Sequence, residues 1–275
     1  PIKGFGDWAE QLIAESTGKN GRGLLPVVVE SAEAPGFRAG ADTDRVTLSD
    51  AAAPSTDVTV GGPLGAQLLT WEFATAVAGR VLQINPFDQP NVQESKDNTK
   101  AVLEKAGDGP LPEGDPLFTE GVVEVHAGNS ELLAGTSTVA GVLERLVAAI
   151  PPNGYLAVMA YLDRLHDADA GRLRALLAGR TGRPVTFGWG PRFLHSTGQY
   201  HKGGPQVGAF LQVTGAHDGD LDVPGQPFTF GRLQLAQALG DLQAIESRDR
   251  PVVRLHLTDR AAGLAQLLSA AGAPA

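Results

Sequence analysis

Short apolar runs alternate with helical patterns along most of this chain of 275 residues. The clearest runs are residues 155–162, 207–214 and 252–257. Apolar residues recur at helical spacing in the stretches between them, at residues 168–177 and 233–245. Strands that alternate with helices favour a mainly parallel sheet covered by helices on its faces. The sequence therefore predicts an α/β fold.

The N-terminal part of the chain shows the same alternation. Residues 24–29 form a continuous apolar run with three valines, which predicts a buried parallel strand. Residues 64–82 carry the strongest helical pattern. A stretch rich in glycine and proline follows at residues 105–118 and predicts a linker. We therefore predict two domains, residues 1–108 and residues 109–275.

Composition excludes several classes of function. The net charge of −9 argues against nucleic acid as a partner, because a phosphate backbone requires a basic surface. The absence of cysteine excludes disulfides and thiolate metal sites, and it favours a cytoplasmic protein. No apolar run approaches the roughly 18–20 residues of a membrane span, and the first residues show no secretion signal. We expect neither a membrane nor a nucleic acid as partner.

The first segment with candidate chemistry is EQLIAESTGK, residues 10–19. Gln11 and Glu15 are four residues apart, so a helix places both on one face. Glu15 falls in the last turn of the expected helix, a position that suits a general base. The alternative is an ordinary glutamate on the surface of an amphipathic helix.

The second segment is INPFDQPNVQESK, residues 84–96. Its two X-Pro steps predict a rigid loop that presents Gln89 and Lys96. A lysine in such a loop can stabilise an oxyanion or move a proton. The alternative is an ordinary loop between helices, with Lys96 in solvent.

The third segment, residues 188–205, combines five glycines with many polar side chains. Long glycine-rich loops on α/β scaffolds often bind ligands, and backbone N–H groups at glycines can approach an anion. The order of residues is not that of a nucleotide-binding P-loop, and no further ligands accompany the two histidines to make a metal site. The candidate side chains are Arg192, His195, Ser196, Thr197, His201 and Lys202.

Together, these segments resemble glucose-6-phosphate isomerases. Residues 10–19 are similar to the start of that family's second sugar-isomerase domain, with its glutamine at Gln11 and its catalytic glutamate at Glu15. Residues 84–96 are similar to the family's late signature, with its glutamine at Gln89 and its active-site lysine at Lys96. Asn91 replaces the usual glycine of that signature, which indicates a divergent branch.

The third segment resembles the C-terminal region of actinobacterial bifunctional transaldolase/glucose-6-phosphate isomerases. The resemblance implies a sugar-isomerase (SIS-like) doubly wound parallel sheet in residues 1–108 and a second α/β domain in residues 109–275. It also implies a phosphosugar substrate, a homodimer and no cofactor. The family's first sugar-isomerase domain, which holds the phosphate loops, precedes the glutamate segment. We therefore expect that this N-terminal sugar-isomerase domain, or a transaldolase domain, is missing from the sequence.

The resemblance also implies roles for the candidates. Glu15 moves a proton between C2 and C1 through a cis-enediol, and Lys96 stabilises the enediolate. The family's ring-opening histidine is not found between Glu15 and Gln89, so His195 or His201 is the substitute. The expected substrate-binding residues are Gln11, Gln89, Arg192, Ser196, Thr197 and Lys202. Two alternatives stay open, namely a non-catalytic phosphosugar-binding or assembly module and a structural remnant kept for oligomer contacts. These two alternatives are favoured if Arg192 and Lys202 do not lie close to Glu15 in the structure.

Overall fold

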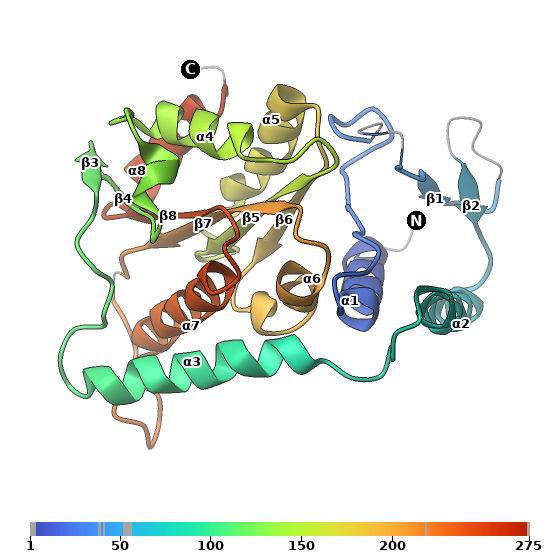
Figure 1. Cartoon of the computed structure of the whole chain (residues 1–275), viewed down its shortest axis with the longest axis horizontal. Coiled ribbons are helices and arrows are strands. Elements are labelled where there is room, and N and C mark those ends of the chain that lie inside the picture. The colour runs from blue at the N-terminus through green and yellow to red at the C-terminus, as the bar shows by residue number, and fades with distance from the viewer. Residues whose placement is uncertain (1–3, 38–39, 41, 52–56, 218, 274–275) are drawn as a thin grey trace.

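A six-stranded sheet forms the centre of the computed structural model (Figure 1), which describes residues 4–37, 40, 42–51, 57–217 and 219–273. The strand order is β3-β4-β8-β7-β5-β6. The four strands from β5 to β8 run parallel to one another, and β3 and β4 add an antiparallel edge. The strands are β3 (Phe118–Glu120), β4 (Val123–His126), β5 (Tyr155–Tyr161), β6 (Val185–Trp189), β7 (Gly208–Gly215) and β8 (Val252–Leu257).

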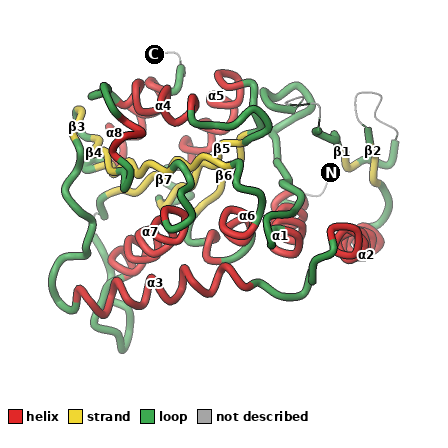
Figure 2. Tube along the Cα trace, in the orientation of Figure 1, coloured by secondary structure: helices red, strands yellow, loops and turns green. Residues whose placement is uncertain are grey.

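Helices cover both faces of the sheet, and this explains the continuous apolar strands. Successive side chains of β5 face opposite sides, so that Leu156 and Val158 pack into one apolar cluster and Ala157 and Met159 into another. The first cluster lies under α4 (Val139–Ala148), α5 (Arg172–Thr181) and α8 (Arg260–Ala270). The second lies under α6 (Thr197–Gly203) and α7 (Phe230–Glu246). Figure 2 shows the strands as a layer between these two sets of helices.

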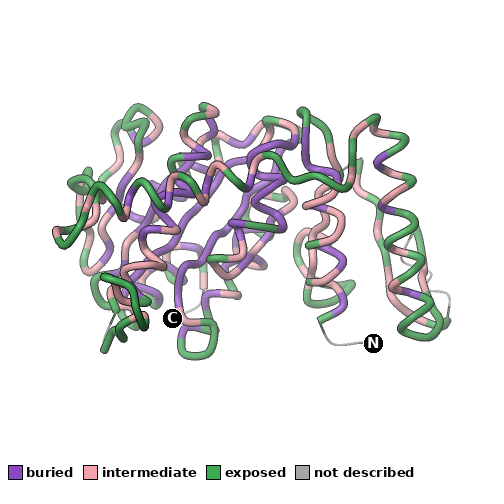
Figure 3. The backbone as a smooth tube through the Cα atoms, turned by 90° about the horizontal axis from the view of Figure 1, so that it is seen from below, coloured by how far each residue is buried: buried purple, intermediate pink, exposed green. Residues whose placement is uncertain are grey.

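The N-terminal elements lie to one side of this sandwich. Helix α1 (Phe5–Thr17) packs beside α6, and α2 (Leu64–Leu82) lies beyond α1 at the edge of the molecule (Figure 1). Two short parallel strands, β1 (Val46–Leu48) and β2 (Val58–Val60), pair near α2. Figure 3 shows α2 mostly exposed. Its exposed residues include Leu69 and Phe73, with 67% and 71% of their surfaces in solvent.

The predicted α/β class is confirmed, since a mainly parallel sheet lies among helices. The six-stranded sheet is built from residues 118–257. The named strands in the described part of residues 1–108 are β1 and β2, which form a separate two-stranded sheet. Helix α3 (Pro90–Ala106) crosses from that N-terminal part and packs along α7 (Figure 1). The SIS-like topology and the division after residue 108 stay predictions. No helix in the described ranges has both the length and the apolar character of a membrane span.

Two predicted local structures are wrong. Residues 24–29 run through the structure without forming a strand, and Pro26 in their middle lacks the N–H that a central strand needs. The predicted loop at residues 84–96 ends at Gln89, because Pro90 begins α3 and thereby places Lys96 on a helix. Proline is well suited to the first position of a helix, because an N–H group at this position has no hydrogen-bond partner within the helix.

A buried ion pair ties α3, α6 and α7 together. Lys202 of α6 donates from Nζ to Asp241 Oδ1 of α7 at 2.5 Å, and both side chains are fully buried. Nζ also donates to the Phe193 carbonyl at 3.0 Å. The Ser95 hydroxyl of α3 donates to the same Asp241 oxygen at 3.0 Å. A charge buried in this way is stable only while its partner is present.

Removal of one member of this pair therefore destabilises the protein. We expect Lys202→Met to lower the free energy of unfolding by about 3–5 kcal/mol, because Asp241 keeps an uncompensated buried charge. The double variant Lys202→Met, Asp241→Leu removes both charges and recovers part of the loss. Urea unfolding followed by circular dichroism measures both effects, with the exposed Lys105→Met as control. A single variant as stable as the parent contradicts this account.

Candidate functional site

Three segments that carry candidate residues meet at the side chain of Gln199, in the middle of α6. Its Nε2 donates to the Gly18 carbonyl at the end of α1 and to Asn91 Oδ1 in the first turn of α3, each at 2.8 Å. The Asn91 backbone amide donates in return to Gln199 Oε1 at 3.0 Å. Gln199 is completely buried. We call this set of contacts the Gln199 clasp, and it joins residues 10–19 to residues 84–96.

The glycines of the third segment allow this close approach. A Cβ added at Gly198 would lie 1.7 Å from the Phe193 carbonyl oxygen. One at Gly203 would lie 2.3 Å from Asn91 Oδ1. The predicted loop is therefore wrong for residues 197–203, since they form the helix α6, which is buried along its whole length and whose glycines lie close to the protein's own chain. The role of this segment in ligand binding stays a prediction.

Lys19 adds a second connection between α1 and the loop before α3. Its side chain is 2% exposed, and its Nζ donates to the Asn85 carbonyl at 2.7 Å and to Asp88 Oδ1 at 2.9 Å. It also donates to the Asp88 carbonyl. This pairing leaves no signal in the sequence, because only the fold brings residues so distant in the chain together.

Glu15 is half-buried in the last turn of α1, and the third segment holds it. Its Oε2 accepts the backbone N–H of Ser196 at 3.0 Å. Ser196 has φ +46° and ψ −126°, a region that a residue with a side chain rarely adopts. Such strain costs on the order of 1–3 kcal/mol and persists only where the surroundings enforce it. The first and third candidate segments therefore adjoin at Glu15.

Arg192, in the short helix η3 (Arg192–Leu194), connects the strained serine to α1. Its Nε donates to Ser196 Oγ at 3.3 Å. Its Nη1 forms an ion pair with Glu10 Oε2 at 2.9 Å, and its Nη2 donates to the Asp7 carbonyl at 2.6 Å. Burial raises the pKa of Glu10 to about 7, although the positive charge of Arg192 acts in the opposite direction. Glu10 was missed in the sequence because nothing in its spacing separates it from a surface glutamate.

The two candidate histidines have different surroundings. His195 is exposed and directly precedes Ser196. His201 is buried, and its ring stacks on Phe193 at 5.7 Å and on Tyr155 at 6.2 Å between ring centroids. Neither ring nitrogen of His201 has a hydrogen-bond partner in the described structure, and burial holds its pKa well below the usual value. His201 is therefore a neutral aromatic group of the core, out of reach of solvent.

The other predicted substrate-binding residues do not converge. Arg192 reaches Glu15 through Ser196, whereas Lys202 turns into the core toward Asp241. Thr197 is buried at the start of α6. Gln11 and Gln89 are exposed, on α1 and just before α3.

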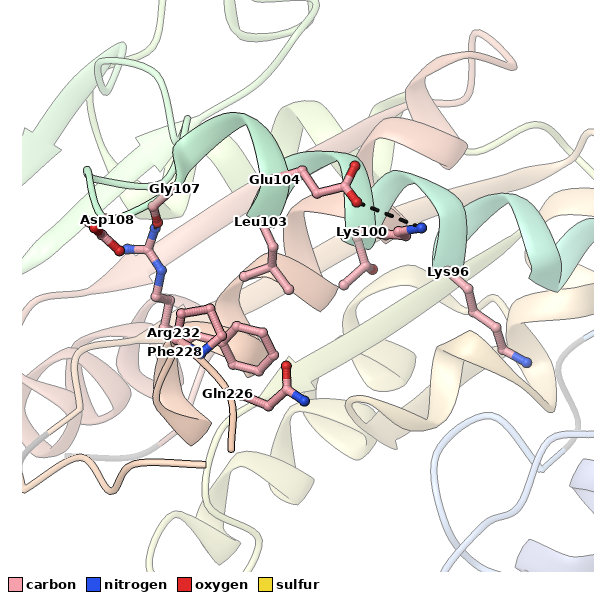
Figure 4. A pocket seen from close by; sticks show the side chains of 11 residues that line it. Lys96, Lys100, Leu103, Glu104, Gly107, Asp108, Gln226, Phe228 and Arg232 are labelled. Carbon is pink, nitrogen blue, oxygen red and sulfur yellow. Dashed lines mark hydrogen bonds and ion pairs between the residues drawn. The ribbon is translucent and has the colours of Figure 1, made fainter. Parts of the chain in front are cut away.

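Lys96 is half-buried and lines a groove of about 510 Å³ between α3 and the segment before α7 (Figure 4). Phe228 and Arg232 lie on the opposite side of this groove, and Arg232 Nη2 donates to the carbonyls of Gly107 and Gly109 at 2.8 and 2.7 Å. No hydrogen bond or ion pair joins Lys96 to the Glu15 network within the described residues.

No group of three or more potential metal ligands lies close together in the described ranges. The contacts around Glu15 hold its carboxylate in place, directly through the Ser196 amide and indirectly through the Arg192 contact with Ser196.

Comparison with known proteins gives one consistent result. The glucose-6-phosphate isomerase of Leptospira biflexa is 28% identical over an aligned length of 155 residues, and the match covers 37% of this chain and 34% of that protein. The enzyme of the same name from Streptococcus pyogenes is 27% identical over an aligned length of 157 residues, and the match covers 38% of this chain and 35% of that protein. The local similarity is to glucose-6-phosphate isomerases. The chain spans about a third of the length of these curated relatives.

Two further comparisons add little. No family model matches the chain. A solved structure of a hypothetical protein from Thermus thermophilus is 14% identical and covers 97% of this chain and 74% of its own, with a TM-score of 0.42.

The unusual pKa of Glu10 makes stability depend on pH. An acid whose pKa is higher in the folded than in the unfolded state binds more protons when folded, so its contribution to stability falls as pH rises. Between pH 5 and pH 8, we expect Glu10 to lower the free energy of unfolding by up to about 3 kcal/mol, at 1.36 kcal/mol per pKa unit. Glu10→Gln removes this component. Urea unfolding at several pH values, with the exposed Glu33→Gln as control, measures the difference in slope, and equal slopes for parent and Glu10→Gln contradict the assignment.

Proposed function

We propose that this chain carries one catalytic half of a phosphosugar aldose–ketose isomerase that interconverts glucose 6-phosphate and fructose 6-phosphate. The observation that carries the proposal is the Gln199 clasp, because it joins the two segments that resemble the signatures of glucose-6-phosphate isomerases. The local similarity to two such enzymes supports the same reaction class.

In this proposal, Glu15 is the base that takes the proton from C2 and returns it to C1 of a cis-enediol. Its Oε2 accepts the Ser196 amide, which leaves Oε1 for the substrate proton. Lys96 stabilises the negative charge of the enediolate. Of the two histidines, His195 suits ring opening better than His201, because it is exposed and adjoins the residue that contacts Glu15.

The substrate phosphate requires a partner beyond these residues. Arg192 and Lys202 each already hold a carboxylate, Glu10 and Asp241 respectively, so neither offers a free cation. We therefore propose that the phosphate binds to the N-terminal sugar-isomerase domain that the resemblance implies. A homodimer, a cytoplasmic location, and the division into a sugar-isomerase domain and a C-terminal α/β domain belong to the same proposal.

A second candidate is a non-catalytic phosphosugar-binding or assembly module. Two observations favour it. Lys96 opens into its own groove without a contact to the Glu15 network in the described residues, and α2 exposes a row of large apolar side chains at Leu69, Phe73 and Val81. Such a surface is typical of a face that another protein part covers.

Conversion of fructose 6-phosphate to glucose 6-phosphate separates the two candidates. The assay uses the purified chain alone and the chain mixed with the N-terminal part of the Leptospira biflexa enzyme. We expect turnover only in the mixture, because the phosphate site is then supplied. Binding of fructose 6-phosphate without turnover in either sample favours the module.

Glu15→Gln tests the base. We expect the rate in the active mixture to fall by about 10²–10⁴-fold, the usual contribution of a general base, while the melting temperature stays close to that of the parent. Glu33→Gln, an exposed glutamate outside the site, keeps full activity. An active Glu15→Gln enzyme removes Glu15 from this role.

Lys96→Ala tests the charge on the enediolate. We expect kcat to fall by roughly 10²–10³-fold, as for other groups that stabilise a developing oxyanion. Lys105→Ala, on the same helix but outside the groove lining, is the matched control. If the two variants have the same kcat, Lys96 does not stabilise the enediolate and is an ordinary lysine of α3.

A further inference from the structure

The guanidinium of Arg192 is occupied on three of its nitrogen atoms. Nη1 pairs with Glu10 Oε2 at 2.9 Å, Nη2 donates to the Asp7 carbonyl at 2.6 Å, and Nε donates to Ser196 Oγ at 3.3 Å. Two of these contacts fix Arg192 to α1, and the third extends to the start of α6. A planar guanidinium that is held at all three of its nitrogen atoms has a fixed position and orientation.

Ser196 is the next member of the chain of contacts. It is fully buried, and its positive φ turns its backbone N–H toward Glu15 Oε2, at 3.0 Å. A strained backbone of this kind keeps its direction only while neighbouring groups oppose relaxation. The Arg192 contact with Ser196 Oγ is the side-chain hydrogen bond that opposes relaxation here.

The contacts form a closed loop that begins and ends on α1. They run from Glu10 through Arg192 and Ser196 to Glu15, five residues further along the same helix. The carboxylate of Glu15 is therefore tied to the backbone of its own helix by two routes, one covalent and one through the third segment. This fixes the direction of one carboxylate oxygen relative to α1.

We infer that Arg192 is a positioning residue, which with Glu10 holds Ser196 so that the serine amide orients the Glu15 carboxylate. Its part in catalysis rests on the proposed function, while the positioning itself does not. This role differs from the sequence-based expectation that Arg192 binds the substrate. Positioning matters because a misplacement of about 1 Å at a reacting group can cost on the order of 10²-fold in rate.

Three variants test the inference. Arg192→Met removes every contact. Arg192→Lys keeps a positive charge for Glu10 but cannot hold Ser196 and the Asp7 carbonyl at the same time. Arg172→Met, an exposed arginine at the start of α5, is the control. The first readout is the hydrogen-exchange rate of the Ser196 amide by NMR, which needs no activity.

We expect the Ser196 amide to exchange at least about tenfold faster in Arg192→Met and in Arg192→Lys, while amides of β5 and the whole Arg172→Met variant stay unchanged. Arg192→Lys stays folded because Glu10 remains paired, so a failure of Arg192→Met to fold leaves the test intact. Unchanged exchange at Ser196 in Arg192→Lys overturns the inference whatever the activity.

The second readout is the kinetic effect in the active mixture. A positioning residue lowers kcat and leaves KM for fructose 6-phosphate close to the parent value, whereas a phosphate ligand raises KM. A raised KM with unchanged kcat therefore also overturns the inference. If no mixture shows turnover, the proposed function fails, and the exchange rates still decide the positioning.

Discussion

The side-chain amide of Gln199 satisfies three hydrogen-bonding groups on two other segments of the chain, and the arrangement around Glu15 depends on it. Gly18 ends α1, Asn91 lies in the first turn of α3, and Gln199 sits between them on a helix that is buried along its length. A buried amide without partners is costly, so α6 is stable inside the protein only when both neighbours are in place. The burial of α6 therefore depends on α1 and α3 being in place.

The same helix is also held by an ion pair. Lys202 holds Asp241 of α7, which also accepts the Ser95 hydroxyl of α3. Ser95 directly precedes Lys96, so its hydrogen bond to the buried pair also fixes the backbone that carries the candidate lysine. Hydrogen bonds through Gln199 and an ion pair through Lys202 therefore link both candidate catalytic segments to α6 and α7, the helices that cover one face of the sheet.

Much of the fold was predictable because its strands are continuous apolar runs. Those runs marked β5, β7 and β8 closely, and the apolar stripes marked α2 and α7. Helix α6 was not predictable, since its polar residues and glycines are those of an exposed loop and the partners of Gln199 are more than a hundred residues away in the chain. Residues 24–29 show the opposite case, in which an apolar run with a proline forms no strand.

The candidate site, like the fold, was predictable from the sequence only in part. The motif is enough to single out Glu15 as a candidate. Arg192 and Lys202, in contrast, look alike in the sequence, and only the fold shows that their surroundings differ.

The glycines around α6 also bear on how this protein can evolve. At Gly18, a Cβ would lie 2.4 Å from the Cα of Tyr200, and at Gly198 it would meet backbone even more closely. A side chain of any size meets the same main-chain obstacle, so these positions offer no series of small, graded steps. Variation that preserves the site must therefore come from side-chain tips such as Asn91 and Gln199, where a change can be matched by a change in its partner. The third segment is expected to drift in sequence by paired replacements and to keep its glycines fixed.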